Sequence, residues 1–362
     1  MSGAISPPGF IRADYFLFAG SGVAMGVTAL CHYSGAPALL AFLCAAIAVA
    51  LLASLVGRSV EQLGDRFGPG ATGVLQSALG NLPELFICLF ALRAGLVDVV
   101  KAAIIGSILA NLLLVMGLCF LTGGLKHGTQ KLDSNRARAI TVLMVLSVAA
   151  LVLPSLASYV HTPASDHEET LSLVASVILL LLFMLSLPAS LKKGSTDLSD
   201  ANHMPGEPPR WSLATAVILL AMAAGAAAFV SDWFVHALEP AMAAVGISEA
   251  FAGLVVIAIA GNAIENVVGI QLALRNQSKY AYAVVINSPL QIALVLAPLL
   301  VILSQTLGYA AFTLVFSPML VVSVAIAVIM SAFITFDGES NWIEGAALIA
   351  VYGVIASSFW WG

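Results

Sequence analysis

Long apolar runs separated by short polar segments recur along the whole chain. Most runs have roughly 20 residues, and a helix rising about 1.5 Å per residue needs that length to cross about 30 Å of hydrocarbon. The pattern therefore predicts an all-α polytopic membrane protein. The eleven expected spans are residues 15–33, 36–57, 69–94, 98–122, 137–159, 169–190, 211–231, 250–274, 280–304, 313–335 and 342–361.

The composition supports a membrane protein and excludes a pair of soluble domains. Hydrophobic residues make up 60% of the 362 residues and charged residues 9%, with a mean hydropathy of +1.03. Nothing resembles a basic patch for nucleic acid. The four cysteines are scattered without CxxC spacing, which predicts neither a disulfide framework nor a metal site. No signal-peptide cleavage site follows the N-terminal segment, so the first apolar run is expected to remain as a span.

With eleven spans, the loops on the two sides of the membrane carry very different numbers of lysines and arginines. Only Arg93 and Lys101 fall on one side of the membrane. Because cytoplasmic loops carry an excess of Lys and Arg, the N-terminus is expected in the cytoplasm and the C-terminus outside. The twelve basic residues on the predicted cytoplasmic side are Arg12, Arg58, Arg66, Lys126, Lys131, Arg136, Arg138, Lys192, Lys193, Arg210, Arg275 and Lys279.

The longest polar stretch, Lys192–Arg210, divides the chain into two halves and is expected to be a flexible cytoplasmic linker. Five predicted spans follow this linker. Six precede it, and without the first span, residues 15–33, these also form a group of five. Because five is odd, the second group must be inverted in the membrane, and inverted repeats place their substrate site at their interface. The expected organisation is an N-terminal segment with the first helix (1–35), a five-helix repeat (36–190), the linker (191–210) and a second five-helix repeat (211–362).

Two similar motifs, one in each half, place a carboxylate inside an apolar run. Gly80–Glu84 reads Gly-Asn-Leu-Pro-Glu, and Gly261–Glu265 reads Gly-Asn-Ala-Ile-Glu. A serine follows the glycine after 27 positions in both halves, at Ser107 and at Ser288, which supports an internal repeat. An ionisable group at membrane depth costs several kcal/mol, so each glutamate indicates an ion path or a proton relay.

The spacing inside the motifs points to cation binding. Asn81 and Glu84 are three residues apart, as are Asn262 and Glu265, and residues with this spacing share a helix face. Gly80, Pro83 and Gly261 weaken their helices, and a local break frees carbonyl oxygens that are tolerated at membrane depth only in a buried or wet site. Carboxylates, carboxamides and carbonyls without His or Cys predict a hard oxygen site for Ca²⁺, and less specifically for Mn²⁺ or Mg²⁺.

The following spans supply further polar side chains. Ser107 and Asn111 are four residues apart, and Ser288 and Gln291 are three apart. Such residues are either cation ligands or hydrogen-bonding contacts between helices, and the sequence favours neither role. The structural alternative for Glu84 and Glu265 requires a basic partner, and no Lys or Arg lies in the middle of a predicted span.

Several segments together resemble the Ca²⁺/H⁺ antiporter family of cation exchangers over residues 36–361. The family implies eleven helices, a cytoplasmic N-terminus and a cation site built from both Gly-Asn-x-x-Glu motifs. The matching segments are Gly57–Leu63, Gly80–Glu84, Leu89–Gly95, Gly106–Val115, Gly261–Glu265, Ser288–Leu294 and Asp337–Gly345.

Some positions differ from the family pattern. Asn266 stands where the family usually has His, Leu82-Pro83 replaces a small Ala-Thr pair, and Asn287-Ser288-Pro289 replaces Gly-Ser-Ala. These positions lie beside the expected ligands. They bear on cation choice and on the pH dependence of coupling, whereas the transport class is unaffected.

The resulting hypothesis is exchange of Ca²⁺ for H⁺ by alternating access, with Glu84 and Glu265 binding cation or protons competitively and titrating as a coupled pair. The transported ions and the lipid bilayer are the expected partners, and neither a cofactor nor an enzymatic reaction is expected. A homo-oligomer is compatible with the sequence. A bacterial inner membrane is the expected location, and an organelle membrane is the alternative. The competing functions are Na⁺-driven cation exchange, a cation channel and an intramembrane enzyme.

The remaining titratable residues have simpler interpretations. Acidic residues near span ends are expected to be solvated or paired within loops. His32, His127, His161, His203 and His236 all lie near loops and are expected to be structural.

Overall fold

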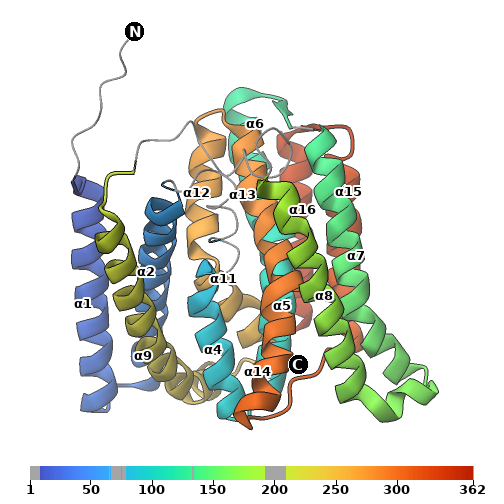
Figure 1. Ribbon diagram of the computed structural model, residues 1–362, viewed down its shortest axis with the longest axis horizontal. Coiled ribbons are helices and arrows are strands. Elements are labelled where there is room, and N and C mark those ends of the chain that lie inside the picture. Colours follow the sequence, from blue (N-terminus) through green and yellow to red (C-terminus); the bar gives the residue numbers. More distant parts are fainter. Residues whose placement is uncertain are drawn as a thin grey trace. The chain divides into compact units, whose positions relative to one another are not determined.

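The computed structural model describes residues 9–64, 66, 75, 79–132, 134–191 and 209–361. Their regular structure is helical apart from one short antiparallel pair, β1 (Gln130–Lys131) with β2 (Glu339–Ser340) (Figure 1). The chain forms two compact units. Unit 1 comprises Met1–Phe90 and Leu187–Val245, and unit 2 comprises Ala91–Ser186 and Gly246–Gly362. Each unit therefore combines segments from before and after the polar linker.

Unit 1 is built mainly on three long helices, α1 (Arg12–Ser34), α2 (Ala38–Gly64) and α9 (Leu213–Val245), which pack against one another (Figure 1). Gly35, with φ +68°, ends α1 and allows the tight turn into α2. Both α2 and α9 bury several alanines, and small side chains let helices in a membrane approach closely.

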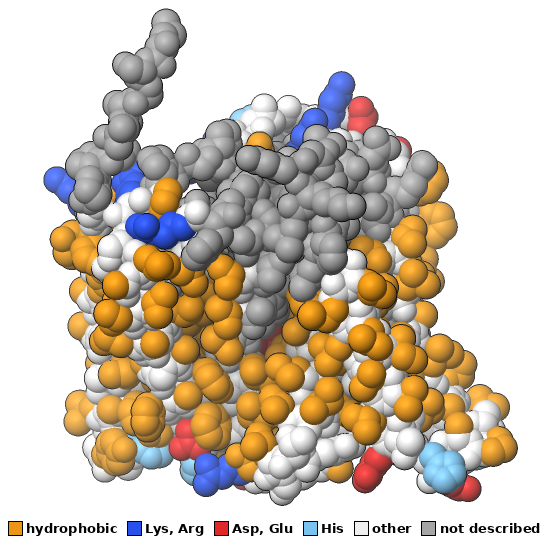
Figure 2. Space-filling view, viewed as in Figure 1, with side chains coloured by type: hydrophobic (Ala, Val, Ile, Leu, Met, Phe, Trp, Pro, Cys, Tyr) orange, Lys and Arg blue, Asp and Glu red, His pale blue; other side chains and the backbone are white. Residues whose placement is uncertain are grey.

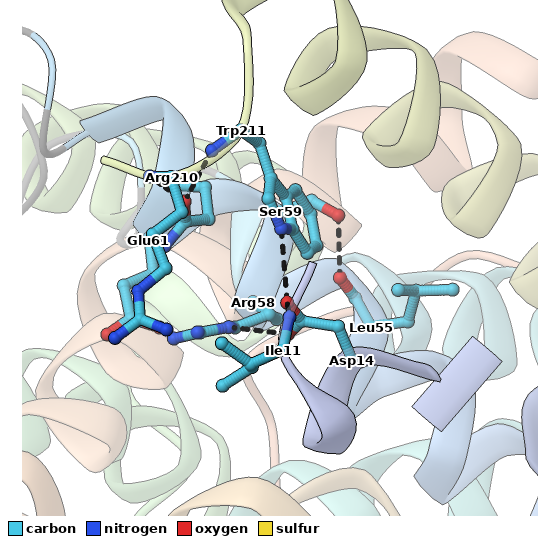
Figure 3. A network of polar contacts seen from close by, with 9 residues as sticks. Ile11, Asp14, Leu55, Arg58, Ser59, Glu61, Arg210 and Trp211 are labelled. Atoms are coloured by element: carbon cyan, nitrogen blue, oxygen red, sulfur yellow. Dashed lines mark hydrogen bonds and ion pairs between the residues drawn. The ribbon is translucent and has the colours of Figure 1, made fainter. Parts of the chain in front are cut away.

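A buried carboxylate joins the beginnings of α1 and α9. Asp14 is 2% exposed and accepts hydrogen bonds from Arg58 Nε (3.3 Å) and Trp211 Nε1 (3.2 Å) (Figure 3). Gln62 Oε1 accepts from the backbone N–H groups of Arg210 (2.8 Å) and Trp211 (3.1 Å). The start of α1 and the end of the linker therefore lie at the same end of unit 1, as the charge distribution predicted.

Unit 2 contains most of the remaining elements, and α4 and α8 cross the boundary between the units. Its helices enclose a core of fully buried aliphatic side chains, among them Ile104, Ile108 and Leu112. The elements are α4 (Leu82–Arg93), α5 (Val97–Leu109), η1 (Ala110–Val115), α6 (Met116–His127), α7 (Ser134–Tyr159), η2 (Pro163–His167), α8 (Glu168–Leu191), α10 (Glu249–Phe251), η3 (Ala252–Ile257), α11 (Ala258–Gly261), α12 (Ala263–Leu274), α13 (Ser278–Gln291), η4 (Ile292–Leu296), α14 (Ala297–Leu307), α15 (Pro318–Thr335) and α16 (Trp342–Ser358).

The ends of the helices in unit 2 also agree with the predicted loop sorting. Lys126 Nζ donates to the Leu274 carbonyl (2.9 Å), and Ser278 Oγ donates to the Lys131 carbonyl (3.0 Å). These loops, all predicted to be cytoplasmic, therefore lie together. The assignment of this end to the cytoplasm stays a prediction.

The predicted tenth span begins too early. Residues 313–317 before α15 are not helical, and the side chains of Leu314 and Phe316 are buried. Ser155 Oγ donates to the Leu314 carbonyl (3.0 Å) and accepts from Phe316 N–H (2.9 Å), while Ser172 Oγ accepts from Leu314 N–H (2.9 Å). These hydroxyls replace the hydrogen bonds that a helix would supply, which allows non-helical backbone to be buried.

Eight helices within the described residues are long and apolar enough to cross a membrane, and a bent pair, Glu249–Gly261 with Glu265–Leu274, makes up to nine. Hydrophobic side chains cover the sides of the helices in each unit, and charged side chains collect near helix ends (Figure 2). The chain is thus a multi-pass membrane protein. The helix α16 is shorter, and residues 69–74 and 76–78 of the predicted third span lie outside the described residues. The count of eleven and the repeat layout stay predictions.

Two glycines allow a close helix crossing in unit 2, where α5 packs against η3. A Cβ atom on Gly106 would lie 2.4 Å from Leu254 Cα, and one on Gly253 would lie 2.3 Å from the Val99 carbonyl oxygen. Both contacts are with backbone, so no side-chain rotation relieves them. Glycine is required at both positions for this crossing.

We therefore expect Gly253→Ala to destabilise the protein, because the two helices must move apart. Overpacking of this kind costs about 1–3 kcal/mol or more. SDS-induced unfolding in mixed micelles measures the loss. Gly225→Ala is the matched control, since a Cβ at this position in α9 meets nothing within 4 Å. Equal unfolding midpoints for the two variants would contradict the close crossing.

Candidate cation site

The Gly-Asn pair of each motif lies directly before the start of a short helix. Gly80 and Asn81 form a turn, α4 begins at Leu82, and Glu84 is its third residue. In the second half α11 ends at Gly261, and α12 begins after Asn262. Glu265 is again the third residue of its helix. The two motifs therefore place their carboxylates at equivalent positions, each in the first turn of a short helix.

The break between α11 and α12 is stabilised by the side chain of Asn262. Its backbone leaves the helical region (φ −98°, ψ 23°), and its Nδ2 donates to the Ala258 carbonyl at 2.8 Å. The helix axis bends by 60° here. A helix C-terminus leaves its last carbonyls without intrahelical donors, so the break presents backbone oxygens at membrane depth. In the first motif, Pro83 occupies the second position of α4, where a missing N–H group is tolerated.

The helix beginnings also influence the charge of the two glutamates. A helix N-terminus carries a partial positive charge that stabilises a nearby carboxylate by about 0.3–1 kcal/mol. Glu84 is 2% exposed and Glu265 is partly buried, so the surrounding protein leaves little water to solvate either anion. Burial therefore disfavours the bare carboxylate anion. Either a bound cation or a bound proton removes this cost.

A buried cluster in unit 2 brings together residues of three segments. Asn111 Nδ2 lies within hydrogen-bond distance of Asn262 Oδ1 (2.8 Å), the Ser107 carbonyl oxygen (3.0 Å) and Ser288 Oγ (3.2 Å). Ser288 Oγ donates to Asn262 Oδ1 at 3.1 Å. Four residues named from the sequence therefore meet, and they come from both halves of the chain.

The hydrogen bonds distinguish the roles that these amides can take. Asn262 Oδ1 accepts from both Asn111 and Ser288, and Asn262 Nδ2 is bound to a carbonyl, so the protein engages the whole carboxamide. Asn111 Oδ1 is buried and, among the described residues, accepts no hydrogen bond. In this geometry Asn111 offers the open oxygen, and Asn262 binds a cation only if one of its hydrogen bonds breaks.

Two further predicted ligands in unit 2, Glu265 and Gln291, lie outside this cluster. Gln291 is the last residue of α13 and is half-buried, and Glu265 lies one turn beyond Asn262 on α12. Within the described residues, no hydrogen bond joins either side chain to the cluster. Gly80, Asn81 and Glu84 belong to unit 1.

The available donors are mainly oxygen atoms. In the described part of the chain, no group of three or more His, Cys, Asp or Glu side chains could hold a metal ion. A cation site here must therefore combine carboxylates with amide, hydroxyl or backbone oxygens. Ca²⁺ is suited to such a site because it accepts neutral oxygens among six to eight ligands.

Two features of the site were not predicted from the sequence. Asn111 lies within the π-helical segment η1, and a second π segment, η4, follows Gln291 directly. Such segments occur often at functional sites, but no residue pattern in the sequence marks them. The second feature is the burial of Asn266 Oδ1, which has no hydrogen-bond partner among the described residues. Its position beside Glu265 was the available signal.

Comparison with known proteins adds an independent observation. A family profile described as "Sodium/calcium exchanger protein" matches residues 37–192 and 215–361. The chain belongs to this family. The match covers both motifs and both halves of the exchanger, and it leaves out residues 1–36, 193–214 and 362.

Relatives of this exchanger confirm the more specific resemblance to Ca²⁺/H⁺ antiporters. The Ca²⁺/H⁺ antiporter ChaA of Bacillus subtilis is 36% identical over 350 residues, which cover 95% of this chain and 98% of the relative. The vacuolar calcium ion transporter of Schizosaccharomyces pombe is 31% identical over 320 residues, which cover 87% of this chain and 77% of the relative.

Solved structures agree with this assignment. The structure of native YfkE is 33% identical and superposes with a TM-score of 0.80, covering 95% of this chain and 99% of the other. The crystal structure of the H⁺/Ca²⁺ exchanger CAX has a TM-score of 0.74 at 18% identity, covering 97% and 93% of the two chains. At that identity, the second match concerns the fold alone.

Proposed function

We propose that this protein exchanges Ca²⁺ for H⁺ by alternating access, with Ca²⁺ as a transported substrate. The observation that carries the proposal is the presence of two Gly-Asn-x-x-Glu motifs, each with its glutamate third in a helix, in a chain 36% identical to an antiporter of these ions. The protein is accordingly a transporter and no enzyme.

The chemistry follows from competition for the carboxylates. Two ionised glutamates at membrane depth are costly when the site is empty, because burial and mutual repulsion both disfavour the charges. One divalent cation or protons on the carboxylates relieve this cost. Cation binding expels protons on one side of the membrane, and protons expel the cation on the other.

Distinct residues carry distinct roles in this scheme. Glu84 and Glu265 hold the cation or the protons, and carbonyls at the two motifs, beginning with those of Gly80 and Gly261, add neutral oxygens. Asn111 supplies a further oxygen, and the cluster with Ser288 and Asn262 holds it in place. The other predicted ligands, Asn81, Ser107 and Gln291, complete the proposed set.

The location and orientation are part of the proposal. Relatives in bacteria and the charge distribution support a bacterial inner membrane with a cytoplasmic N-terminus and an external C-terminus. With protons flowing inward, the protein exports Ca²⁺. The surrounding lipid is its only obligatory partner in this scheme.

Na⁺-driven exchange is the second candidate. It is favoured by the sequence Leu82-Pro83-Glu84, which resembles Na⁺/Ca²⁺ exchangers, and by the family profile. The high identity to proton-coupled relatives makes H⁺ the better choice. A channel is disfavoured, because an inverted repeat within one chain is typical of transporters.

The test is ⁴⁵Ca²⁺ uptake into proteoliposomes under a proton gradient, a Na⁺ gradient or neither. We expect uptake with the proton gradient only, and an ionophore that dissipates this gradient should abolish it. The apparent affinity for Ca²⁺ should also fall as the pH on the Ca²⁺ side is lowered, because protons compete for the same oxygens. Uptake driven by Na⁺ alone would establish the second candidate instead.

A further inference from the structure

Two histidines lie close together at the end of unit 1 opposite Asp14. His32 is in the last turn of α1, and His236 is in α9. Their ring centres are 6.1 Å apart. His32 is also stacked on Trp233, with ring centres 5.6 Å apart and an angle of 24° between the planes. Histidine and acidic side chains gather at this end of the helices (Figure 2, lower left).

The hydrogen bonding of His236 determines which ring nitrogen is available. Its Nδ1 lies 2.8 Å from the Asp232 carbonyl oxygen, which can only accept, so Nδ1 carries the proton. The neutral ring therefore has its lone pair on Nε2, and the side chain is 65% exposed. This arrangement, with one nitrogen oriented by a carbonyl, is the usual preparation of a metal-binding histidine.

The separation of the rings is close to that of two ligands on one ion. A metal–nitrogen distance of about 2.0–2.1 Å puts the ring centre roughly 3 Å from the metal, so two ligand rings have centres roughly 5–6 Å apart. The 6.1 Å between the ring centres of His32 and His236 lies at the upper edge of this range. No third His, Cys, Asp or Glu ligand is placed to join them within the described residues, so water completes the coordination.

We propose that His32 and His236 form a surface site for a transition-metal ion of the Zn²⁺, Ni²⁺ or Cu²⁺ class. Imidazole nitrogens suit these ions, whereas Ca²⁺ prefers the oxygens of the transport site. The bound ion links α1 to α9, two helices from opposite sides of the linker. The site is separate from the proposed transport reaction and does not depend on it.

The test uses tag-free full-length protein in detergent, titrated with Ni²⁺ or Cu²⁺ while tryptophan fluorescence is recorded. Both ions quench nearby indoles, so the stacked Trp233 reports occupancy. His32→Gln and His236→Gln should each weaken the apparent affinity roughly tenfold or more, because loss of an outer-shell partner alone costs 10–100-fold. His127→Gln is the matched control and should behave as the wild type.

Two further measurements locate the quenching. Trp233→Phe should remove most of the saturable quenching. Added Zn²⁺ should compete with Ni²⁺ for the site, so the fluorescence that Ni²⁺ quenched should recover. Excess Ca²⁺ should leave Ni²⁺ binding unchanged. The proposal is overturned if the histidine variants bind Ni²⁺ as the wild type does, or if Ca²⁺ or the Glu265→Gln substitution abolishes the signal.

Discussion

Proton-driven Ca²⁺ uptake is expected to fall to the level of protein-free liposomes when Glu84 or Glu265 is replaced by glutamine. Glutamine keeps the shape and one oxygen but removes the negative charge and the proton-binding group, so neither half of the exchange can proceed. Initial ⁴⁵Ca²⁺ uptake under a fixed proton gradient measures the effect. Glu239→Gln, which changes an exposed carboxylate, is the matched control and should keep wild-type rates.

The aspartate variants sharpen this prediction. Glu84→Asp and Glu265→Asp retain the charge, but the side chain is one methylene shorter and holds the carboxylate farther from the cation. Partial activity with weaker Ca²⁺ affinity is therefore expected. A single symmetric peak in size-exclusion chromatography shows that each variant is folded. If folded Glu84→Gln or Glu265→Gln protein transports Ca²⁺ at the wild-type rate, the carboxylates are not the exchange site.

Replacement of Asn111 is expected to have the second largest effect. Asn111→Leu removes the amide that contacts Asn262 and Ser288 and places an apolar side chain against their buried oxygens, which costs about 1–3 kcal/mol. If this cost raises the free energy of activation for transport, the Ca²⁺ uptake rate falls roughly tenfold or more. Uptake kinetics measure the loss, and unfolding in SDS mixed micelles separates it from instability.

A double-mutant cycle tests whether Asn111 and Ser288 act together in transport. The effects of Asn111→Ala and Ser288→Ala should not be additive, because the two side chains contact each other and both donate to the same Asn262 oxygen. Ser147→Ala is the matched control, since that buried hydroxyl bonds only within its own helix, to the Leu143 carbonyl. Additive effects for Asn111 with Ser288 would mean that the cluster has no common role.

The sequence by itself determined the class of the protein, the position of the helix break at Asn262 and the start of a helix directly after Asn81. Membrane spans depend on local hydrophobicity, which is independent of tertiary contacts. The break and the helix start depend on Gly, Asn and Pro, whose backbone preferences are also local. A carboxylate in such a place has few explanations, so Glu84 and Glu265 could be named as candidates. The family comparison agrees with this interpretation.

Only the tertiary structure decided which polar groups meet. Asn111 and Asn262 are 151 positions apart, and helical spacing relates residues within one helix but not between helices. Any buried amide can pair with any other, so the sequence did not reveal that Asn262 is engaged while Asn111 keeps an open oxygen. The non-helical segment before α15 was unpredictable for the same reason, because its hydrogen-bond partners are serines on α7 and α8. His32 and His236 likewise become a pair only because α1 packs against α9.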